Sequence, residues 1–289
     1  MACYRLDVKP SAEGQRVDAL IRRFLPELPP HVVRGAFEHR DVKVDGKRVK
    51  PDVRVSAGQV VMVYCMEQTG PTLDVVYEDD DVLLVNKRAG VSVEPDEKGG
   101  VSLVELAAAH VSRKAPDAPS PIACHRLDNQ TCGLTLLAKN ERAAAILQDA
   151  FRDRTMDKRY ICLVRGQMKP PSATCRAFLL KDADAARVTI LDHDAPGARP
   201  IVTAYETLEA GPVSRLRVHL ITGRTHQIRA HMAALGHPLL GDDVYGDRAF
   251  NRALHAQGKL MLCSAEMTLD TGGRLPQLDG KRFSIPCPF

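Results

Sequence analysis

The chain has 289 residues, of which 44% are hydrophobic and 26% are charged, and its formal net charge is +4. These values are typical of an ordinary soluble protein with one large core or two unequal ones. The chain has no run of about 18 uncharged apolar residues and no apolar segment behind basic residues at its start, so we expect neither secretion nor a membrane span and predict a cytoplasmic protein.

Eight cysteines are scattered along the chain, and none forms a Cys-x-x-Cys pair. In a chain of this length without a secretory leader, such spacing favours reduced thiols over a disulfide framework. It also lacks the ligand spacing of a zinc site, so we expect no structural metal.

The excess of positive charge lies in residues 16–64, which contain ten Lys or Arg residues and six Asp or Glu residues. Apolar residues at helical spacing, proline breaks and an Asp45-Gly46 turn between alternating segments indicate two short helices and a small sheet. The helices are expected at 17–25 and 32–39, and the strands at 42–44 and 53–64. Residues 1–64 are therefore predicted to form a small domain of their own.

This order of elements resembles the small RNA-binding domain named after ribosomal protein S-four. The resemblance implies that basic side chains of the segment contact RNA phosphates, whose charge dominates nucleic-acid binding. The expected contacts are Arg16, Arg22, Arg23, Arg34, Arg40, Lys43, Lys47 and Arg48. The alternative is a generic basic helix-hairpin unit whose charges only solvate its surface.

A polar segment that ends in Gly70-Pro71 predicts a linker over 65–71 and a larger domain over 72–289. Ser102 and Glu105 have the spacing of a capping box and mark the start of a helix. The first elements of this domain are expected to be strands at 73–77 and 82–86 around an acidic turn, and helices at 102–111 and 141–154.

Three separated segments carry residues suited to chemistry. His125-Arg-Leu-Asp-Asn-Gln-Thr-Cys-Gly133 places one carboxylate, Asp128, in a turn-forming sequence. Lys158-Arg-Tyr-Ile-Cys-Leu-Val-Arg-Gly166 has the pattern of a strand with Tyr160 near its start. Thr222-Gly-Arg-Thr-His-Gln-Ile-Arg-Ala-His231 leads into a helix whose first turn carries Arg229. Taken alone, Asp128 would most simply cap a loop and Tyr160 would belong to a core.

Together, these segments resemble the RluA family of pseudouridine synthases. The family pattern reads His-Arg-Leu-Asp-x-x-Thr-Ser-Gly-Leu in the first segment, with Cys132 in place of the serine here, and Lys-x-Tyr-x-x-Leu-Val-x-Gly in the second. The resemblance implies an isomerase that converts uridine to pseudouridine in RNA without a metal or organic cofactor. It also implies an α+β fold with a mixed, mainly antiparallel sheet.

The resemblance assigns catalytic roles to three residues. Asp128 would add to the substrate or remove a ribose proton, and Tyr160 would stack on the uracil and serve in proton removal. Arg229 would hold the carboxylate, because a guanidinium offers a bidentate fork and favours the ionised acid. Arg126 would fill the space left by the flipped uridine. The residues expected to bind the substrate are His125, Arg126, Leu127, Thr131, Arg224, His226 and Gln227.

Ribosomal RNA is the expected substrate, with transfer RNA as an alternative, and no obligatory protein partner is evident. Two other functions compete with this one. A non-catalytic RNA-binding protein of the same fold would not require Asp128, Tyr160 and Arg229. An aspartyl-phosphate phosphatase would require a second aspartate where Gln130 stands. His226 and His231 are five residues apart without the glutamate of His-Glu-x-x-His, so we expect no zinc site there.

Overall fold

The computed structural model describes residues 2–25, 28, 30–65, 73–96, 100–182 and 187–289. The chain forms two compact units, Met1–Leu73 with Pro95–Ser120, and Asp74–Glu94 with Pro121–Phe289. The segment Pro95–Ser120 thus groups with the first unit, whereas the sequence analysis placed it in the larger domain. The predicted linker at 65–71 lies outside the described residues except for Cys65.

The first unit contains a small sheet with two helices that share its apolar core. Its elements are β1 (Ala2–Asp7), a 3-10 turn (Pro10–Ala12), α1 (Val17–Phe24), α2 (Pro30–Glu38), β2 (Val42–Val44), β3 (Lys47–Arg48) and β4 (Val60–Cys65). The strands are antiparallel in the order β1-β4-β2-β3. Val17, Leu20 and Ile21 of α1 are buried in the core, as their helical spacing predicted.

Two features of this sheet differ from the sequence-based expectation. Strand β1, at the sheet edge, was not expected, although Tyr4 and Leu6 pack against the core and alternate with the exposed Cys3, Arg5 and Asp7. The strand predicted over 53–64 begins only at Val60. Gly58 has a φ of 86°, a left-handed conformation that interrupts an extended strand.

Helix α3 (Leu103–Lys114) begins at the capping box that the sequence predicted. The Glu105 backbone N–H donates to Ser102 Oγ at 3.2 Å, and the Ser102 N–H donates to Glu105 Oε2 at 2.9 Å. These reciprocal bonds satisfy two backbone donors that the first helical turn leaves without partners.

The second unit is built on one long sheet. Its strands are β5 (Val75–Glu78), β6 (Val82–Lys87), β7 (Ile122–Ala123), β8 (Cys132–Ala138), β9 (Asp157–Arg165), β10 (Ser172–Asp182), β11 (Arg187–Leu191), β12 (Arg199–Glu209), β13 (Val213–Leu220), β14 (Leu262–Thr268) and β15 (Arg282–Ser284). The order is β11-β10-β12-β13-β9-β14-β8-β6-β5, with β15 on β14 and β7 on β8. Among the described residues, β8 pairs with β14 in parallel and the other pairings are antiparallel. The α+β fold with a mixed, mainly antiparallel sheet is therefore confirmed.

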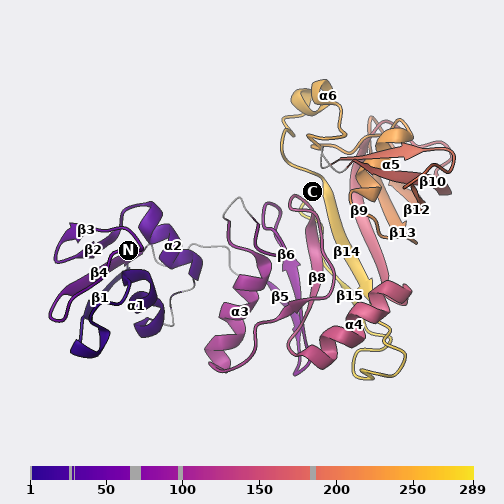
Figure 1. Cartoon of the computed structure of the whole chain (residues 1–289). Coiled ribbons are helices and arrows are strands. Elements are labelled where there is room, and N and C mark those ends of the chain that lie inside the picture. The colour runs from indigo at the N-terminus through magenta and orange to yellow at the C-terminus, as the bar shows by residue number, and fades with distance from the viewer. Residues whose placement is uncertain (1, 26–27, 29, 66–72, 97–99, 183–186) are drawn as a thin grey trace. The chain divides into compact units, whose positions relative to one another are not determined.

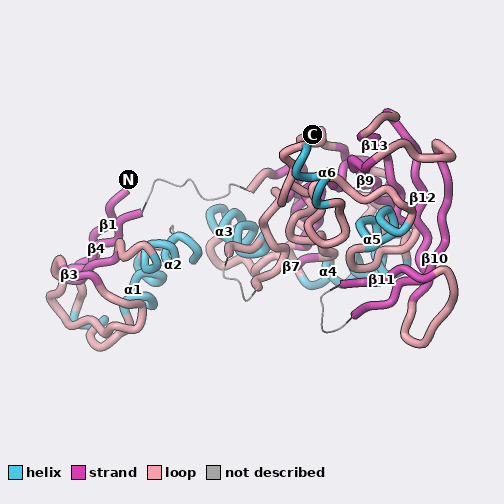
Figure 2. The backbone as a smooth tube through the Cα atoms, turned by 90° about the horizontal axis from the view of Figure 1, so that it is seen from above, coloured by secondary structure: helices cyan, strands magenta, loops and turns pink. Residues whose placement is uncertain are grey.

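In the described part of this unit, three helices accompany the sheet: α4 (Glu141–Asp153), α5 (Gln227–Ala234) and α6 (Arg248–Ala253). The small residues Ala143, Ala144 and Ala150, together with Leu147, form the buried face of α4, and the helix lies against β8 (Figure 1). Helix α5 lies against β11 and β12 (Figure 2). No helix in the described ranges has the length and apolar character needed to cross a bilayer.

Strand β8 runs between β6 and β14, and all seven of its residues are buried (Figure 1). At its start, Gly133 has a φ of 115° and touches the neighbouring strand so closely that a Cβ would lie 2.4 Å from the Ser264 carbonyl oxygen. Only glycine fits such a close backbone approach. The loop that carries Asp128 is thus joined directly to the interior of the sheet.

Candidate active site

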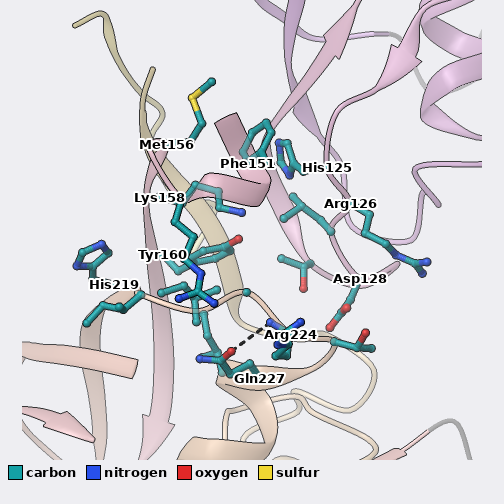
Figure 3. A pocket seen from close by; sticks show the side chains of 18 of the residues that line it. His125, Arg126, Asp128, Phe151, Met156, Lys158, Tyr160, His219, Arg224 and Gln227 are labelled. Carbon is teal, nitrogen blue, oxygen red and sulfur yellow. Dashed lines mark hydrogen bonds between the residues drawn. The ribbon is translucent and has the colours of Figure 1, made fainter. Parts of the chain in front are cut away.

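A cavity of about 800 Å³ lies between the loop before β8, the start of β9 and the segment that links β13 to α5 (Figure 3). It gathers every residue that the sequence predicted for catalysis or substrate binding: His125, Arg126, Leu127, Asp128, Thr131, Tyr160, Arg224, His226, Gln227 and Arg229. Segments about a hundred residues apart in sequence therefore converge on one site. The eight predicted RNA-binding residues belong to the first unit.

The Asp128 loop is held by backbone hydrogen bonds and by one buried lysine. The Thr131 N–H donates to the Asp128 carbonyl at 3.0 Å and closes a turn. The ammonium of Lys87, at the end of β6, donates to three backbone carbonyls, among them that of Asn129 at 2.9 Å. Burial lowers the pKa of Lys87 to about 8. This role of Lys87 was not predicted from the sequence.

Cys132, which stands where the family pattern has serine, is buried at the other end of this loop. Its thiol donates to the Leu262 carbonyl at 3.5 Å, so it still links β8 to the start of β14. A thiol is a weaker donor than a hydroxyl, but the burial of both groups preserves the contact.

Arg229, in the first turn of α5, bridges two carboxylates. Its Nη1 donates to Asp128 Oδ2 at 3.2 Å, while its Nε and Nη2 donate to the two oxygens of Asp242 at 2.7 and 2.9 Å. Burial alone would lower the pKa of Arg229, but its bonds to Asp242 and the charges of Asp242 and Asp128 raise it. Burial likewise opposes ionisation of Asp242, and the bonds and charge of Arg229 nevertheless lower its pKa. The guanidinium is therefore permanently charged and fixed in orientation beside Asp128.

His226 is a second neighbour of the Asp128 carboxylate. Its Nε2 lies 3.7 Å from Asp128 Oδ2, and its Nδ1 lies 3.0 Å from the Tyr245 hydroxyl. That hydroxyl accepts a hydrogen bond from the Val188 N–H at 2.9 Å, and in the described residues His226 Nδ1 is its available acceptor. We assign the Tyr245 proton to this bond with Nδ1, an assignment that places the imidazole proton on Nε2, toward Asp128. Burial lowers the pKa of His226, so this neutral tautomer predominates at pH 7.

Tyr160 forms a buried wall of the cavity (Figure 3). Burial, with a further contribution from the charge of Asp128, raises the pKa of its phenol far above the usual value. The phenol therefore remains protonated at neutral pH. This environment favours stacking of the ring on an aromatic base over removal of a proton by a phenolate.

Gln227 and His125 line the cavity and use their polar atoms to brace it. Gln227 Oε1 accepts a hydrogen bond from the Thr222 hydroxyl at 2.9 Å. It also accepts one from the Arg224 N–H at 3.1 Å (Figure 3). His125 Nε2 accepts from the Leu136 N–H at 3.1 Å, and its Nδ1 is buried without a partner in the described part of the chain. Burial and the nearby Lys158 lower the pKa of His125 well below its usual value, so the ring is neutral.

The charged side chains of the cavity that have no partner of opposite charge in the residues that the structure describes are all cations. Its carboxylates are both engaged, Asp128 with Arg229, and Asp157 with Arg159 and His219. Four lining cations have no carboxylate within 4.0 Å among the described residues: Arg126, Arg154, Lys158 and Arg224. The same part of the chain contains no group of three His, Cys, Asp or Glu residues arranged to hold a metal ion.

The model of the RNA pseudouridylate synthase family matches residues 81–234, which contain Asp128, Tyr160 and Arg229. The chain belongs to this family. The "Ribosomal large subunit pseudouridine synthase C" of Vibrio vulnificus is 33% identical over 91% of this chain and 87% of its own length. The protein of the same name from Escherichia coli is 33% identical over 85% of this chain and 80% of its own. The protein is accordingly an isomerase, as the sequence predicted.

Solved structures show the same synthase fold. Human RNA Pseudouridylate Synthase Domain Containing 1 superposes with a TM-score of 0.62 at 27% identity, covering 78% of this chain and 87% of its own. Human RNA Pseudouridylate Synthase Domain Containing 4 gives the same TM-score at 20% identity, covering 74% of this chain and 88% of its own.

Two residues near the synthase site were not recognised from the sequence. Asp242 and Tyr245 occur in Gly241-Asp-Asp-Val-Tyr-Gly246, a segment that was not predicted to take part in the site. Asp242 does accept hydrogen bonds from the backbone of Val244 and Tyr245, but it also holds Arg229. The absence of other acidic residues between 210 and 241 was the available signal, because a buried arginine requires a carboxylate partner.

Proposed function

We propose that this synthase isomerises uridines of large-subunit ribosomal RNA, with Asp128 as the reacting group. This role is supported by a difference between the surroundings of the two oxygens of the Asp128 carboxylate. Arg229 and His226 both lie beside Oδ2, whereas Oδ1 accepts no hydrogen bond from the described residues. One oxygen is thus held and the other is left for the substrate.

The reaction breaks the bond between N1 of uracil and C1′ of ribose, turns the base and rejoins C1′ to C5, while C5 loses a proton and N1 gains one. No atom is gained or lost overall. Oδ1 of Asp128 would either add to the substrate or remove a ribose proton to give a glycal. Tyr160 would support the detached uracil by stacking. Arg229 would keep the carboxylate ionised and correctly oriented.

The unpaired cations of the cavity suit an RNA strand. Arg126 and Arg224 are exposed at the rim, where the strand's phosphates would neutralise them. A flipped uridine leaves a gap in its stack, and Arg126, on the same loop as Asp128, would fill it. None of this chemistry requires a metal, so activity should survive treatment of the protein with EDTA, with RNA-bound magnesium controlled separately.

Ribosomal RNA is favoured over transfer RNA because the relatives with 33% identity are named for the large ribosomal subunit. The test is to map pseudouridine across cellular RNA in a strain that lacks the protein. Loss of sites in large-subunit ribosomal RNA, restored by the wild-type gene, is expected. Losses confined to transfer RNA would instead establish the alternative substrate. The expected site of action is the cytoplasm.

Residues 1–64 would add RNA affinity as an S-four-like domain. Lys47 and Arg48 of β3 are exposed and have no carboxylate partner in the described residues. Replacing both by Gln should reduce the slope of log K against log salt by roughly 0.7–0.9 per lost phosphate contact. Arg5→Gln is the matched control, because Arg5 is also exposed but pairs with Asp7. If the double variant and Arg5→Gln have equal salt slopes, Lys47 and Arg48 do not contact RNA phosphates and only keep the surface of the unit hydrated.

The role of Asp128 is tested by Asp128→Asn, which keeps the shape of the side chain and removes its charge. We expect no detectable pseudouridine and RNA affinity within a few-fold of wild type. Asp149→Asn, on α4 and outside the cavity, should leave turnover unchanged. Near-wild-type turnover by Asp128→Asn would contradict the assignment and would reopen a purely RNA-binding role for this site.

A further inference from the structure

Lys158 enters the cavity beside Tyr160 and has no role in the chemistry above. The two residues are separated by one position in β9, so their side chains lie on the same face of the strand, and both line the cavity (Figure 3). The Lys158 Nζ lies 5.0 Å from the centroid of the Phe151 ring, at the end of α4. This position is within the range of a cation–π contact.

The ammonium of Lys158 has no anionic partner within the described ranges. Asp157, next to it in sequence, is engaged by Arg159 and His219, and His125 is neutral. For comparison, the partly buried Lys139 pairs with Glu78 at 3.0 Å. Burial lowers the pKa of Lys158 to about 8, which is the behaviour of a dehydrated cation without a compensating charge.

A partly dehydrated cation is costly unless a bound anion offsets it. The anion that an RNA substrate brings into this cavity is the phosphodiester group. A neutral uracil carbonyl would offset less of the cost, because hydrogen bonds between two charged groups are stronger than those with one neutral partner. The cavity, at about 800 Å³, also exceeds the space that a single nucleoside fills.

We propose that Lys158 binds a phosphodiester group of the RNA strand directly next to the reacting uridine. It acts as a positioning residue, because it holds the strand so that the ribose meets Asp128 and the base meets Tyr160. The inference rests on an RNA substrate and on the location of the site, and it does not depend on which RNA is modified.

The test compares Lys158→Met, which keeps the apolar stem, with Lys158→Arg, which keeps the charge. The probe is a short oligoribonucleotide carrying one uridine that the wild-type protein converts. Lys158→Met should weaken binding about tenfold and reduce the salt slope by roughly 0.7–0.9, and Lys158→Arg should recover most of both. The matched control is Lys281→Met, because Lys281 also lies over an aromatic ring, that of Tyr77 at 4.3 Å, but does not line the cavity.

A second arm removes the charge from the RNA. In a set of oligonucleotides, each phosphate that flanks the uridine is replaced, one at a time, by an uncharged methylphosphonate. One of them should weaken wild-type binding as much as Lys158→Met does, and combining the two changes should cost no more than either alone. Additive losses at every phosphate would overturn the proposal. A lower kcat with unchanged affinity and salt slope would also overturn it, because Lys158 would then act on the base.

Discussion

Arg229 and Asp242 form a bidentate ion pair, with Nε to Oδ2 at 2.7 Å and Nη2 to Oδ1 at 2.9 Å. The side chain of Asp242 is fully buried, and the pair leaves only Nη1 of Arg229 directed toward Asp128. The orientation of the group beside Asp128 is thus set by a residue that does not line the cavity.

Asp242→Asn should therefore impair both stability and catalysis. Loss of one partner of a buried ion pair leaves an uncompensated charge and costs about 3–5 kcal/mol. The measurements are equilibrium unfolding in urea and kcat/KM on an RNA substrate that carries the target uridine. Arg229→Lys keeps the charge but loses the fork, so it should lower kcat more than it lowers stability. Wild-type kcat/KM in Asp242→Asn would contradict this coupling.

Tyr245→Phe should change the tautomer of His226. Without the hydroxyl, Nδ1 loses its hydrogen-bond donor, and the ¹⁵N chemical shifts of the ring should indicate less protonation at Nε2. The loss of one hydrogen bond should lower kcat/KM about three- to tenfold. Tyr205→Phe is the control, because its hydroxyl donates to the Pro170 carbonyl at 3.0 Å and does not reach His226. Unchanged ring shifts in Tyr245→Phe would refute the tautomer assignment.

RNA affinity should fall as the pH rises above about 8. The pKa of Lys158 is about 8 in the free protein, and a bound phosphate would raise it. Below this pH, Lys158 is charged in both the free and the RNA-bound protein, so the affinity does not depend on pH. Above it, the free protein must take up a proton to bind, and the affinity falls by up to about tenfold per pH unit. His125 and His226 have lowered pKa values and stay neutral across this range.

Lys158→Arg should abolish this pH step, because arginine remains charged. The pKa of Lys87 is also about 8, so any step that persists in the arginine variant reports loosening of the Asp128 loop. An undiminished step in Lys158→Arg would therefore reassign the titration to Lys87. Fluorescence anisotropy at constant ionic strength is the suitable measurement.

Gly133→Ala should destabilise the second unit by about 2–5 kcal/mol, because it combines a strained φ with a clash against the Ser264 backbone. Gly90→Ala isolates the first effect. Gly90 also has a positive φ, 84°, but a Cβ there meets no atom within 4 Å, so about 1 kcal/mol is expected. Thermal unfolding distinguishes them, since each kcal/mol shifts Tm by roughly 2–4 °C in a protein of this size. Similar Tm values for the two variants would argue against the clash.

Several elements of the fold were predictable from the sequence because they depend on residues that are close to one another along the chain. The capping box at Ser102, the helical spacing of α1 and α4, and the turn around the Asp128 loop each follow from interactions within a few residues. The edge strand β1 was not predicted, although Tyr4 and Leu6 alternate with the exposed Cys3, Arg5 and Asp7.

The parts of the site that escaped prediction depend on contacts between distant segments. Arg229 and Asp242 are 13 residues apart, and their pairing requires the turn after α5 to bring them together. Lys158 is the first residue of the Lys-x-Tyr pattern, but the pattern assigns it no role, and its burial beside Phe151 without a carboxylate partner is visible only in the structure. Motif resemblance is sufficient to propose Asp128 as the reacting group, whereas the residues that orient its carboxylate become visible only in the three-dimensional packing.

The burial of every residue of β8 has a consequence for how the enzyme moves. Amide exchange in such a strand requires the opening of most of the unit, since its hydrogen bonds lie in the sheet interior. Asp128 lies four residues before this strand and its carboxylate is held by Arg229, whereas the side chains of Arg126 and Arg224 are exposed. If Asp128 is the reacting group, as we propose, the substrate must adjust to a carboxylate that is held in place, and we expect that adjustment in the exposed side chains of the cavity and in the RNA strand.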